Sequence, residues 1–243
     1  MSNPQDNNLQ DPRNQIIVAL DGSIEESMLW AKELSGHAVW VKVGMTLFYQ
    51  TGPRIIDDMK DMGYKVFLDL KLHDIPHQVE NASSKLATLG VDLMTVHASG
   101  GRAMMASAVL GARTGAEAAG KDAPKVVAVT VLTSMTDDTL KSIGIMDNAQ
   151  VQVERLLRLS KEACVDGIVC SPHEAATARS ILGIGASIVT PGVRPLGADK
   201  GDQSRVMTPK RALEAGATQL VIGRPITQAK DRVRAFNDIV EEL

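Results

Sequence analysis

Charged side chains follow an apolar run within residues 66–76. The run has strand character, and Asp69, Lys71 and Asp74 fall at its end. Because alternate side chains of a strand share a face, Phe67, Asp69 and Lys71 should point in the same direction. If that face were a barrel interior, the charges of Asp69 and Lys71 would be costly to desolvate unless the two were paired and took part in the function of the protein. The alternative is an ordinary strand end whose charges reach solvent.

Eight apolar runs recur along the chain, and each is followed by a segment of helical pattern. Strands of a parallel sheet produce such runs because they are buried on both faces. Eight units in 243 residues predict one α/β domain, a (β/α)₈ TIM barrel over residues 15–243, after a disordered polar lead-in at 1–14. An open doubly wound sheet is the main competitor, but no GxGxxG motif follows the first run. The runs cover residues 16–20, 38–43, 65–71, 93–97, 126–132, 167–170, 187–190 and 219–222.

Local signals predict where several helices begin. Ser23 and Glu26 have the spacing of a capping box, before a helix that continues to about Leu34. Pro76 suits the first turn of another helix. Residues 45–62 are expected to form one helix despite an internal Gly-Pro pair.

The overall composition excludes several classes of function. The formal net charge is −3 and no Lys/Arg cluster stands out, so no nucleic-acid partner is expected. No run approaches the roughly 20 apolar residues of a membrane span, and no signal peptide is apparent. Cys164 and Cys170 are expected to be buried free thiols. These features predict a soluble, cytoplasmic protein.

The carboxyl ends of the predicted strands carry the candidate catalytic residues, as is usual in barrel enzymes. Lys42 ends the second run on the same face as Trp40, so it should point into the barrel mouth. A salt bridge would explain any one charged residue there, whereas four that converge indicate chemistry. These four are Lys42, Asp69, Lys71 and Asp74.

The last two strands are followed by a candidate phosphate site. Gly223 and Arg224 come directly after the eighth run, where barrels commonly bind phosphate with backbone N–H groups. Arg194 and Gln203 lie in the long polar segment 192–206 that follows the seventh run. A phosphorylated small molecule is the predicted ligand.

The histidines do not predict a metal site. His73 and His77 are four residues apart, but Pro76 should start the helix between them, so they need not share a face. His97, at the end of the fourth run, is expected to be a structural, hydrogen-bonded residue. No Ser/His/Asp or Cys/His arrangement for a nucleophile is evident.

The segment from Asp69 to Ile75 resembles the D-x-K-x-x-D-I signature of the orotidine 5'-phosphate decarboxylase family. The resemblance, to the bacterial form, covers nearly the whole chain from Ile17. One departure is Gln78, where the family usually has Thr. Further matching motifs are Val-Ala-Leu-Asp21, Lys42-Val-Gly, Val-His97-Ala-Ser-Gly-Gly, Val-Leu-Thr133-Ser134-Met, Thr-Pro-Gly-Val-Arg194-Pro, Gly-Asp-Gln203 and Val-Ile-Gly223-Arg224-Pro.

This resemblance implies cofactor-free decarboxylation of orotidine 5'-monophosphate to UMP, the last step of UMP synthesis. It implies that Lys71 stabilises and then protonates a carbanion at C6, and that a homodimer brings Asp74 and Ile75 into the neighbouring site. The implied substrate contacts are Asp21 and Lys42 for the ribose, Thr133 and Ser134 for the pyrimidine, Arg194, Gln203, Gly223 and Arg224 for the phosphate, Ile75 from the neighbouring subunit, and Gln78.

Two other functions stay open at this point. Related barrels share D-x-K-x-x-D but use Mg²⁺ on sugar phosphates, as in 3-keto-L-gulonate 6-phosphate decarboxylase or hexulose phosphate synthase. Segments 133–135 and 201–203 oppose that reading, because they resemble base-reading and lid segments of the nucleotide enzyme. A non-catalytic nucleotide-binding barrel is the second alternative, and the intact Lys71 with both acids opposes it.

Overall fold

A computed structural model describes residues 11–195 and 207–243 of the chain. Most of the expected lead-in, residues 1–10, lies outside the described residues, but the expectation of disorder is wrong for residues 11–14. Pro12–Gln15 form a 3₁₀ helix, η1, and the Asp11 side chain caps it by accepting a hydrogen bond from the N–H of Arg13. A capping acid followed by proline suits such a start, because proline presets the helical φ.

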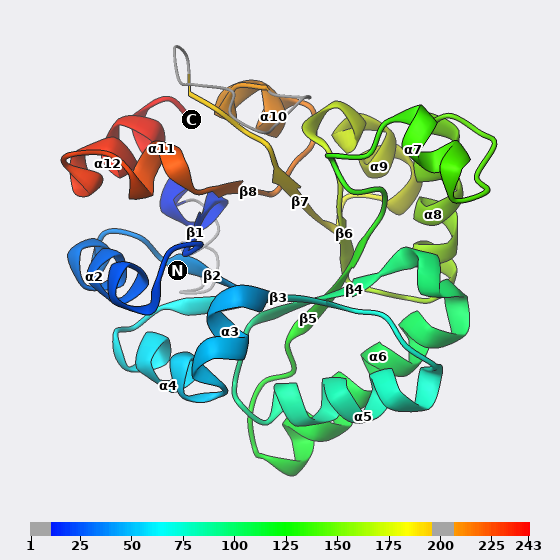
Figure 1. The fold of residues 1–243 in the computed structure, drawn as a ribbon, viewed down its shortest axis with the longest axis horizontal. Helices are drawn as coiled ribbons and strands as arrows, with labels where there is room; N and C mark the ends of the chain where they lie inside the picture. Colours follow the sequence, from blue (N-terminus) through cyan, green and yellow to red (C-terminus); the bar gives the residue numbers. More distant parts are fainter. Residues whose placement is uncertain (1–10, 196–206) are drawn as a thin grey trace, which may run out of the picture.

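Eight parallel strands close into a barrel in sequence order, with the helices around it (Figure 1). The prediction of a (β/α)₈ barrel is therefore confirmed, and the open-sheet alternative is wrong. The strands are β1 (Ile16–Ala19), β2 (Trp40–Gly44), β3 (Lys65–Leu72), β4 (Leu93–His97), β5 (Lys125–Val129), β6 (Gly167–Val169), β7 (Ser187–Pro191) and β8 (Gln219–Ile222).

The helices begin largely where the sequence predicts. Ser23 and Glu26 form the expected capping box of α2, and Pro76 is the first residue of α5. The single helix expected at 45–62 is wrong, because Gly52 adopts φ 65° and divides it into α3 and α4. The helices are α2 (Ile24–Leu34), α3 (Met45–Thr51), α4 (Arg54–Asp61), α5 (Pro76–Ala87), α6 (Gly101–Ala118), α7 (Asp137–Ser142), α8 (Ala149–Glu162), α9 (Ala175–Leu182), α10 (Pro209–Glu214), α11 (Arg224–Thr227) and α12 (Arg232–Glu241), with short 3₁₀ helices η2 (Ala98–Gly100) and η3 (Pro172–Glu174).

The strands bury both faces, as their continuous apolar runs require. One face contributes to a core between the barrel wall and the helices, which contains Val18, Leu68 and Met94. The other face fills the barrel interior with a separate cluster that includes Phe67 and Leu93. Side chains two positions further along β3 and β4 therefore point toward the carboxyl mouth of the barrel.

Helices α5 and α6 approach each other closely because α6 presents glycine at their contact. A Cβ atom added at Gly111 would overlap the backbone carbonyl oxygen of Glu80, and one at Gly115 would overlap that of Ser84. Since α5 begins at Pro76, this packing helps to fix the turn that follows β3.

Two further findings concern the expectations from composition. Cys170 is buried as expected, but Cys164 is exposed, because it lies in the turn after α8 with φ 55°. Within residues 11–195 and 207–243, no helix has the length and apolar character needed to cross a membrane.

Candidate active site

The barrel has a cavity at each end, and the two differ in chemistry. The carboxyl-end cavity has a volume of about 180 Å³ and the amino-end cavity about 1380 Å³. The smaller one is lined by Lys42, Phe67, Asp69, Lys71, Val129, Val131, Leu132, Thr133, Val169, Cys170, Pro191 and Val221.

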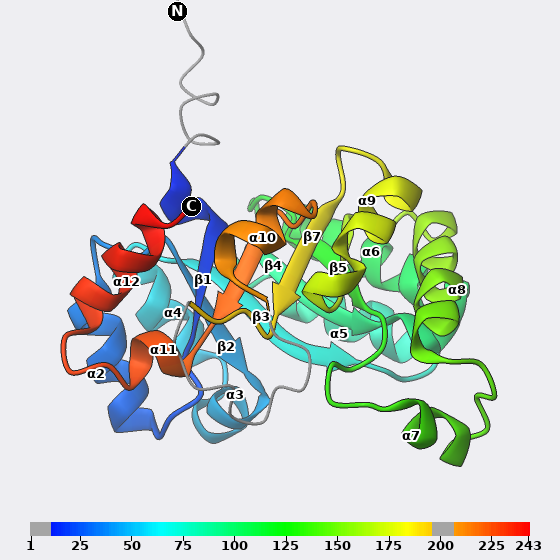
Figure 2. The ribbon, with the colours of Figure 1, turned by 90° about the horizontal axis from the view of Figure 1, so that it is seen from above.

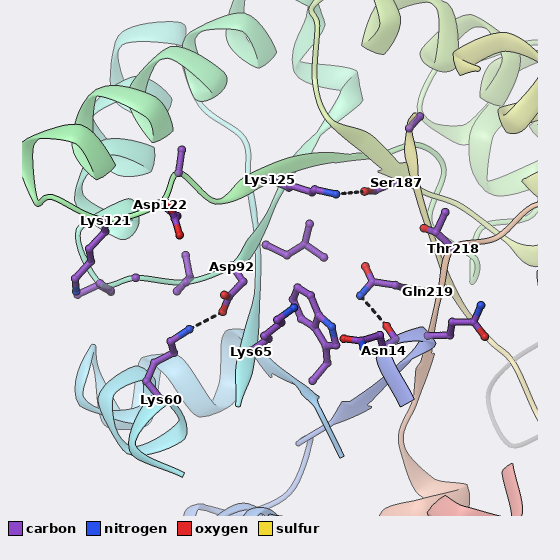
Figure 3. Close-up of a pocket in the computed structure, with 18 of the residues that line it drawn as sticks. Asn14, Lys60, Lys65, Asp92, Lys121, Asp122, Lys125, Ser187, Thr218 and Gln219 are labelled. Atoms are coloured by element: carbon purple, nitrogen blue, oxygen red, sulfur yellow. Dashed lines mark hydrogen bonds and ion pairs between the residues drawn. The ribbon is translucent and has the colours of Figure 1, made fainter. Parts of the chain in front are cut away.

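The amino-end cavity is large but electrically balanced (Figure 3). Four lysines and four aspartates line it, and several of its polar side chains contact one another. Lys60 pairs with Asp92 at 2.8 Å, and the Nζ atom of Lys125 lies 3.4 Å from the hydroxyl of Ser187. Its walls include the first residues of several strands, and this end of a barrel usually serves stability rather than catalysis. We therefore place the candidate site at the carboxyl end.

A chain of alternating charges crosses the carboxyl-end cavity. The Nζ atom of Lys42 lies 2.7 Å from Oδ1 of Asp21 and 3.9 Å from Oδ2 of Asp69. The Nζ atom of Lys71 lies 2.7 Å from the same Oδ2 of Asp69. The side chains of Lys42, Asp69 and Lys71 are only 9%, 12% and 25% exposed, so water screens these charges weakly. The structure therefore brings together three of the four residues that were predicted to converge, Lys42, Asp69 and Lys71.

The strand that carries Asp69 and Lys71 departs from regular geometry at Lys71. This residue adopts φ 52°, in the left-handed region. Leu68 pairs with Met94 and Leu72 with Val96, so β3 contains two more residues than β4 over this stretch. The ammonium group of Lys71 still reaches the cavity, but a bulge rather than simple alternation directs it there.

Asp74 does not join this network within one chain. It is exposed beyond the end of β3, and its Oδ1 accepts a hydrogen bond of 2.7 Å from the N–H of Ile75. Ile75 and Gln78 are also exposed, Ile75 to 63%. Within a single chain the fourth charge of the array is therefore Asp21, and the convergence of Asp74 on its own barrel is not observed.

The remaining predicted contact residues lie around the same mouth. Thr133 lines the cavity, whereas Ser134 is exposed beside it. α7, which follows these residues, lies beyond the carboxyl ends of the strands (Figure 2). Arg194 is 9% exposed, and its Nη1 donates to the carbonyl of Val193 at 2.9 Å.

The candidate phosphate residues come from neighbouring strand ends. Gly223 precedes α11 and Arg224 is its first residue, directly after β8. Arg194 follows β7, which pairs with β8. These residues do not line the 180 Å³ cavity and lie outside its walls. Gln203 lies outside the described residues.

His97 ends β4 beside the charged network. Burial is the main cause that lowers its pKa, and the positive charges of His73 and Lys71 add to it, while Asp69 acts in the opposite direction. The rings of His73 and His97 lie 5.5 Å apart. The lowered pKa keeps the imidazole of His97 neutral at neutral pH. In the part of the chain that the structure describes, no three His, Cys, Asp or Glu side chains gather as a metal site requires.

Two parts of the site were not predicted from the sequence. Apolar side chains from β5, β6 and β8, including Val129, Val169 and Val221, form the walls opposite Lys71. Thr95 on β4 contacts both Asp69 and Lys71. Its position two residues after Leu93, on the interior face, is the signal that could have identified it.

Comparisons with known proteins agree with this geometry. Residues 14–239 match the model of the "Orotidine 5'-phosphate decarboxylase / HUMPS family". Orotidine 5'-phosphate decarboxylase of Pseudoalteromonas translucida is 46% identical over 230 residues, which cover 94% of this chain and 97% of that protein. The enzyme of the same name from Shewanella sediminis is 48% identical over 229 residues, 94% of this chain and 96% of that protein.

Two solved structures have a fold similar to that of this chain. The crystal structure of orotidine 5'-phosphate decarboxylase from Lactobacillus acidophilus has a TM-score of 0.84 and 41% sequence identity, and the match covers 94% of this chain and 98% of that one. An uncharacterized conserved protein from Geobacillus kaustophilus has a TM-score of 0.83 and 38% identity, over 93% of this chain and 99% of that one.

Proposed function

Because the chain belongs to the orotidine 5'-phosphate decarboxylase family, we infer from its site how it performs the family's reaction. The chain is a carboxy-lyase that decarboxylates orotidine 5'-monophosphate to UMP in pyrimidine biosynthesis. The observation that carries the mechanism is the Lys71–Asp69 pair, 2.7 Å long, at the edge of an apolar cavity.

The difficulty of the reaction lies in the electron pair left at C6. Loss of CO₂ places this pair in the plane of the pyrimidine ring, where the π-system cannot absorb it. We propose that the ammonium group of Lys71 stabilises the developing carbanion and then protonates it. For this task the ammonium group must be held in place, and it forms a 2.7 Å ion pair with the carboxylate of Asp69.

The other charges extend the ion-pair network around Asp69. Lys42 lies between Asp69 and Asp21, so each internal charge has an opposite neighbour. We propose that Asp21 and Lys42 also bind the ribose hydroxyls, for which an exposed carboxylate and an ammonium group are suitable partners. The substrate carboxylate would then lie near Asp69, and its departure as uncharged CO₂ suits the apolar walls formed by Val129 and Val169.

The cavity holds only part of the substrate. Its 180 Å³ is below the roughly 300–1,000 Å³ of typical small-molecule sites, so it suits the pyrimidine rather than the whole nucleotide. We propose that Thr133 and Ser134 contact the base and that the phosphate extends to Arg194, Gln203, Gly223 and Arg224. Arg194 and Arg224 are supported by their origin at the ends of the neighbouring strands β7 and β8.

We further propose a homodimer in which the partner subunit's Asp74 approaches Lys71. The exposed run from His73 to Gln78 supports this, because it combines an exposed Ile75 with a carboxylate that pairs with no cation in the described part of its own chain. Gln78 lies in the same run and would face the neighbouring site. Cys164 and Cys170 are thiols rather than halves of a disulfide, which supports a reducing, cytoplasmic location.

The reaction can be followed as the loss of orotidine monophosphate absorbance with purified protein. Lys71→Ala should abolish turnover while UMP still binds, because the variant lacks the cation needed at C6 but keeps the phosphate contacts. If Lys71→Ala retains most of the wild-type kcat, the mechanism is wrong.

The Mg²⁺-dependent sugar-phosphate reaction remains the second candidate, since the matching family model also includes HUMPS proteins. The relatives that are 46% and 48% identical over almost the whole chain oppose it, because both are orotidine 5'-phosphate decarboxylases. Full activity on orotidine monophosphate in excess EDTA would exclude a metal requirement, whereas no turnover of orotidine monophosphate together with Mg²⁺-dependent turnover of 3-keto-L-gulonate 6-phosphate would favour the second candidate.

A further inference from the structure

Thr95 is a buried residue of β4 that contacts both members of the central ion pair. Its side chain is 1% exposed. The Oγ1 atom donates a hydrogen bond to Oδ1 of Asp69 at 3.0 Å and accepts one from the backbone N–H of Lys71 at 2.8 Å. Because Nζ of Lys71 donates to Oδ2 of Asp69, the two oxygens of this carboxylate are held by two different groups.

The bond to the Lys71 backbone has a second effect. Lys71 adopts φ 52°, a conformation that costs a residue with a Cβ atom on the order of 1–3 kcal/mol. The register shift between Leu68 and Leu72 interrupts the ladder with β4 at this point. The hydroxyl of Thr95 supplies the partner for the Lys71 N–H there. Without it, a backbone donor in the partly buried bulge would lose its acceptor.

We propose that Thr95 is a positioning residue for the decarboxylation, which acts through Asp69 and Lys71. One hydroxyl fixes the carboxylate from one side and the strained backbone of Lys71 from the other, so the ammonium group is held where negative charge develops. Thr95 is 1% exposed and is not among the described residues that line the cavity, so we place it behind Asp69 rather than against the base. This inference rests on the proposed role of Lys71.

Thr95→Val tests the inference because it removes the hydroxyl and preserves the shape of the side chain. We expect kcat to fall roughly 10- to 100-fold, the rate equivalent of one hydrogen bond to a charged group. The KM for orotidine monophosphate and the Kd for UMP should stay within about threefold of wild type, since the substrate contacts are unchanged. Thr95→Ser retains the hydroxyl and should restore most of the rate.

Thr190→Val is the matched control. Thr190 is equally buried on β7, and its hydroxyl lies 3.5 Å from the backbone carbonyl of Gln219, away from the charged network. Thr190→Val should keep the wild-type kcat. Urea unfolding of every variant separates a loss of rate from a loss of folded protein, and Thr95→Ala replaces Thr95→Val if the valine variant does not fold.

The outcomes distinguish this inference from the proposed function. If Thr95→Val keeps kcat within about threefold of wild type, or if Thr95→Ser loses as much as Thr95→Val, the positioning role is wrong. It is also wrong if Thr190→Val shows the same loss. Each of these results leaves the proposed function intact provided that wild type turns over orotidine monophosphate and Lys71→Ala does not.

Discussion

Replacement of Asp69 by asparagine tests how much of the catalysis depends on the charge beside Lys71. Asn preserves the size of the side chain and an acceptor oxygen but removes the negative charge. In the wild type, this charge lies 2.7 Å from Nζ of Lys71 and 3.9 Å from Nζ of Lys42. Asp69→Asn therefore leaves two weakly exposed ammonium groups without the carboxylate between them.

The size of the effect follows from the geometry. At 2.7 Å and an effective dielectric constant of about 20, the Coulomb attraction between Lys71 and Asp69 is about 6 kcal/mol. Side-chain exposure of 25% for Lys71 and 12% for Asp69 reduces this value through solvent screening. Removal of one member of such a pair typically costs about 2–5 kcal/mol. If most of that loss appears in the transition state, kcat falls roughly 30- to 5,000-fold.

The assay is the loss of orotidine monophosphate absorbance, with Asp92→Asn as the control. Asp92 forms a 2.8 Å pair with Lys60 at the opposite end of the barrel, so the same chemical change is made far from the proposed chemistry. Asp92→Asn should alter stability but leave kcat near wild type. The reasoning is refuted if Asp69→Asn keeps kcat within about fivefold of wild type, or loses no more than Asp92→Asn.

Three further predictions concern other parts of the molecule. Arg224→Ala should weaken UMP binding roughly tenfold or more by calorimetry, because a charge-assisted phosphate contact is lost, and an unchanged affinity contradicts the phosphate role. The control is Arg234→Ala, which should leave UMP binding unchanged because the side chain of Arg234 is 78% exposed on α12. Because the pKa of His97 is lowered in the folded protein, the unfolded chain takes up this proton first as the pH falls below about 6.5, and the free energy of unfolding should decrease from there down to the folded-state pKa. In urea titrations His97→Gln should show a smaller decrease, and a decrease equal to that of wild type would mean that His97 is not the cause. Gly111→Ala should lower the free energy of unfolding by about 1–3 kcal/mol, because the added Cβ atom overlaps α5. Gly185→Ala should change this free energy little, because a Cβ atom there meets no atom within 4 Å, and equal urea midpoints for the two variants would mean that the close helix contact is not required.

The architecture was predictable because its signals are local and repeated. Each strand is an apolar run, and capping residues such as Ser23 mark the following helix independently of tertiary contacts. The error at residues 45–62 has the opposite origin. Helical propensity on both sides favoured continuity, whereas Gly52 adopts a left-handed φ that ends α3 before Pro53.

The charged residues of the site were predictable for a related reason. Alternation along a strand places Phe67 and Asp69 on the interior face, and Lys42 follows the same rule on β2. The same alternation places Thr95 on the interior face, but its contact with Lys71 depends on a bulge in β3, and a register shift between two strands leaves no signature in either sequence alone. Likewise, the exposure of Asp74 reflects the turn before Pro76 rather than the strand period.

The bulge at Lys71 suits the position that the proposed mechanism requires of its ammonium group. When CO₂ leaves, the negative charge does not disappear but moves from the carboxylate to C6. An ammonium group that favours both positions equally binds the substrate without accelerating the reaction, so it must favour C6. Such discrimination between two neighbouring atoms depends on placement to a fraction of an ångström. Lys71 is held at both ends, its Nζ by Asp69 and its backbone N–H by Thr95, and Thr95 also holds Asp69. A regular strand would pair the backbone of Lys71 with β4 and leave only the flexible side chain to set the position. In the proposed mechanism the strained conformation serves the chemistry, because it places the lysine backbone within reach of the same hydroxyl that orients its counter-ion.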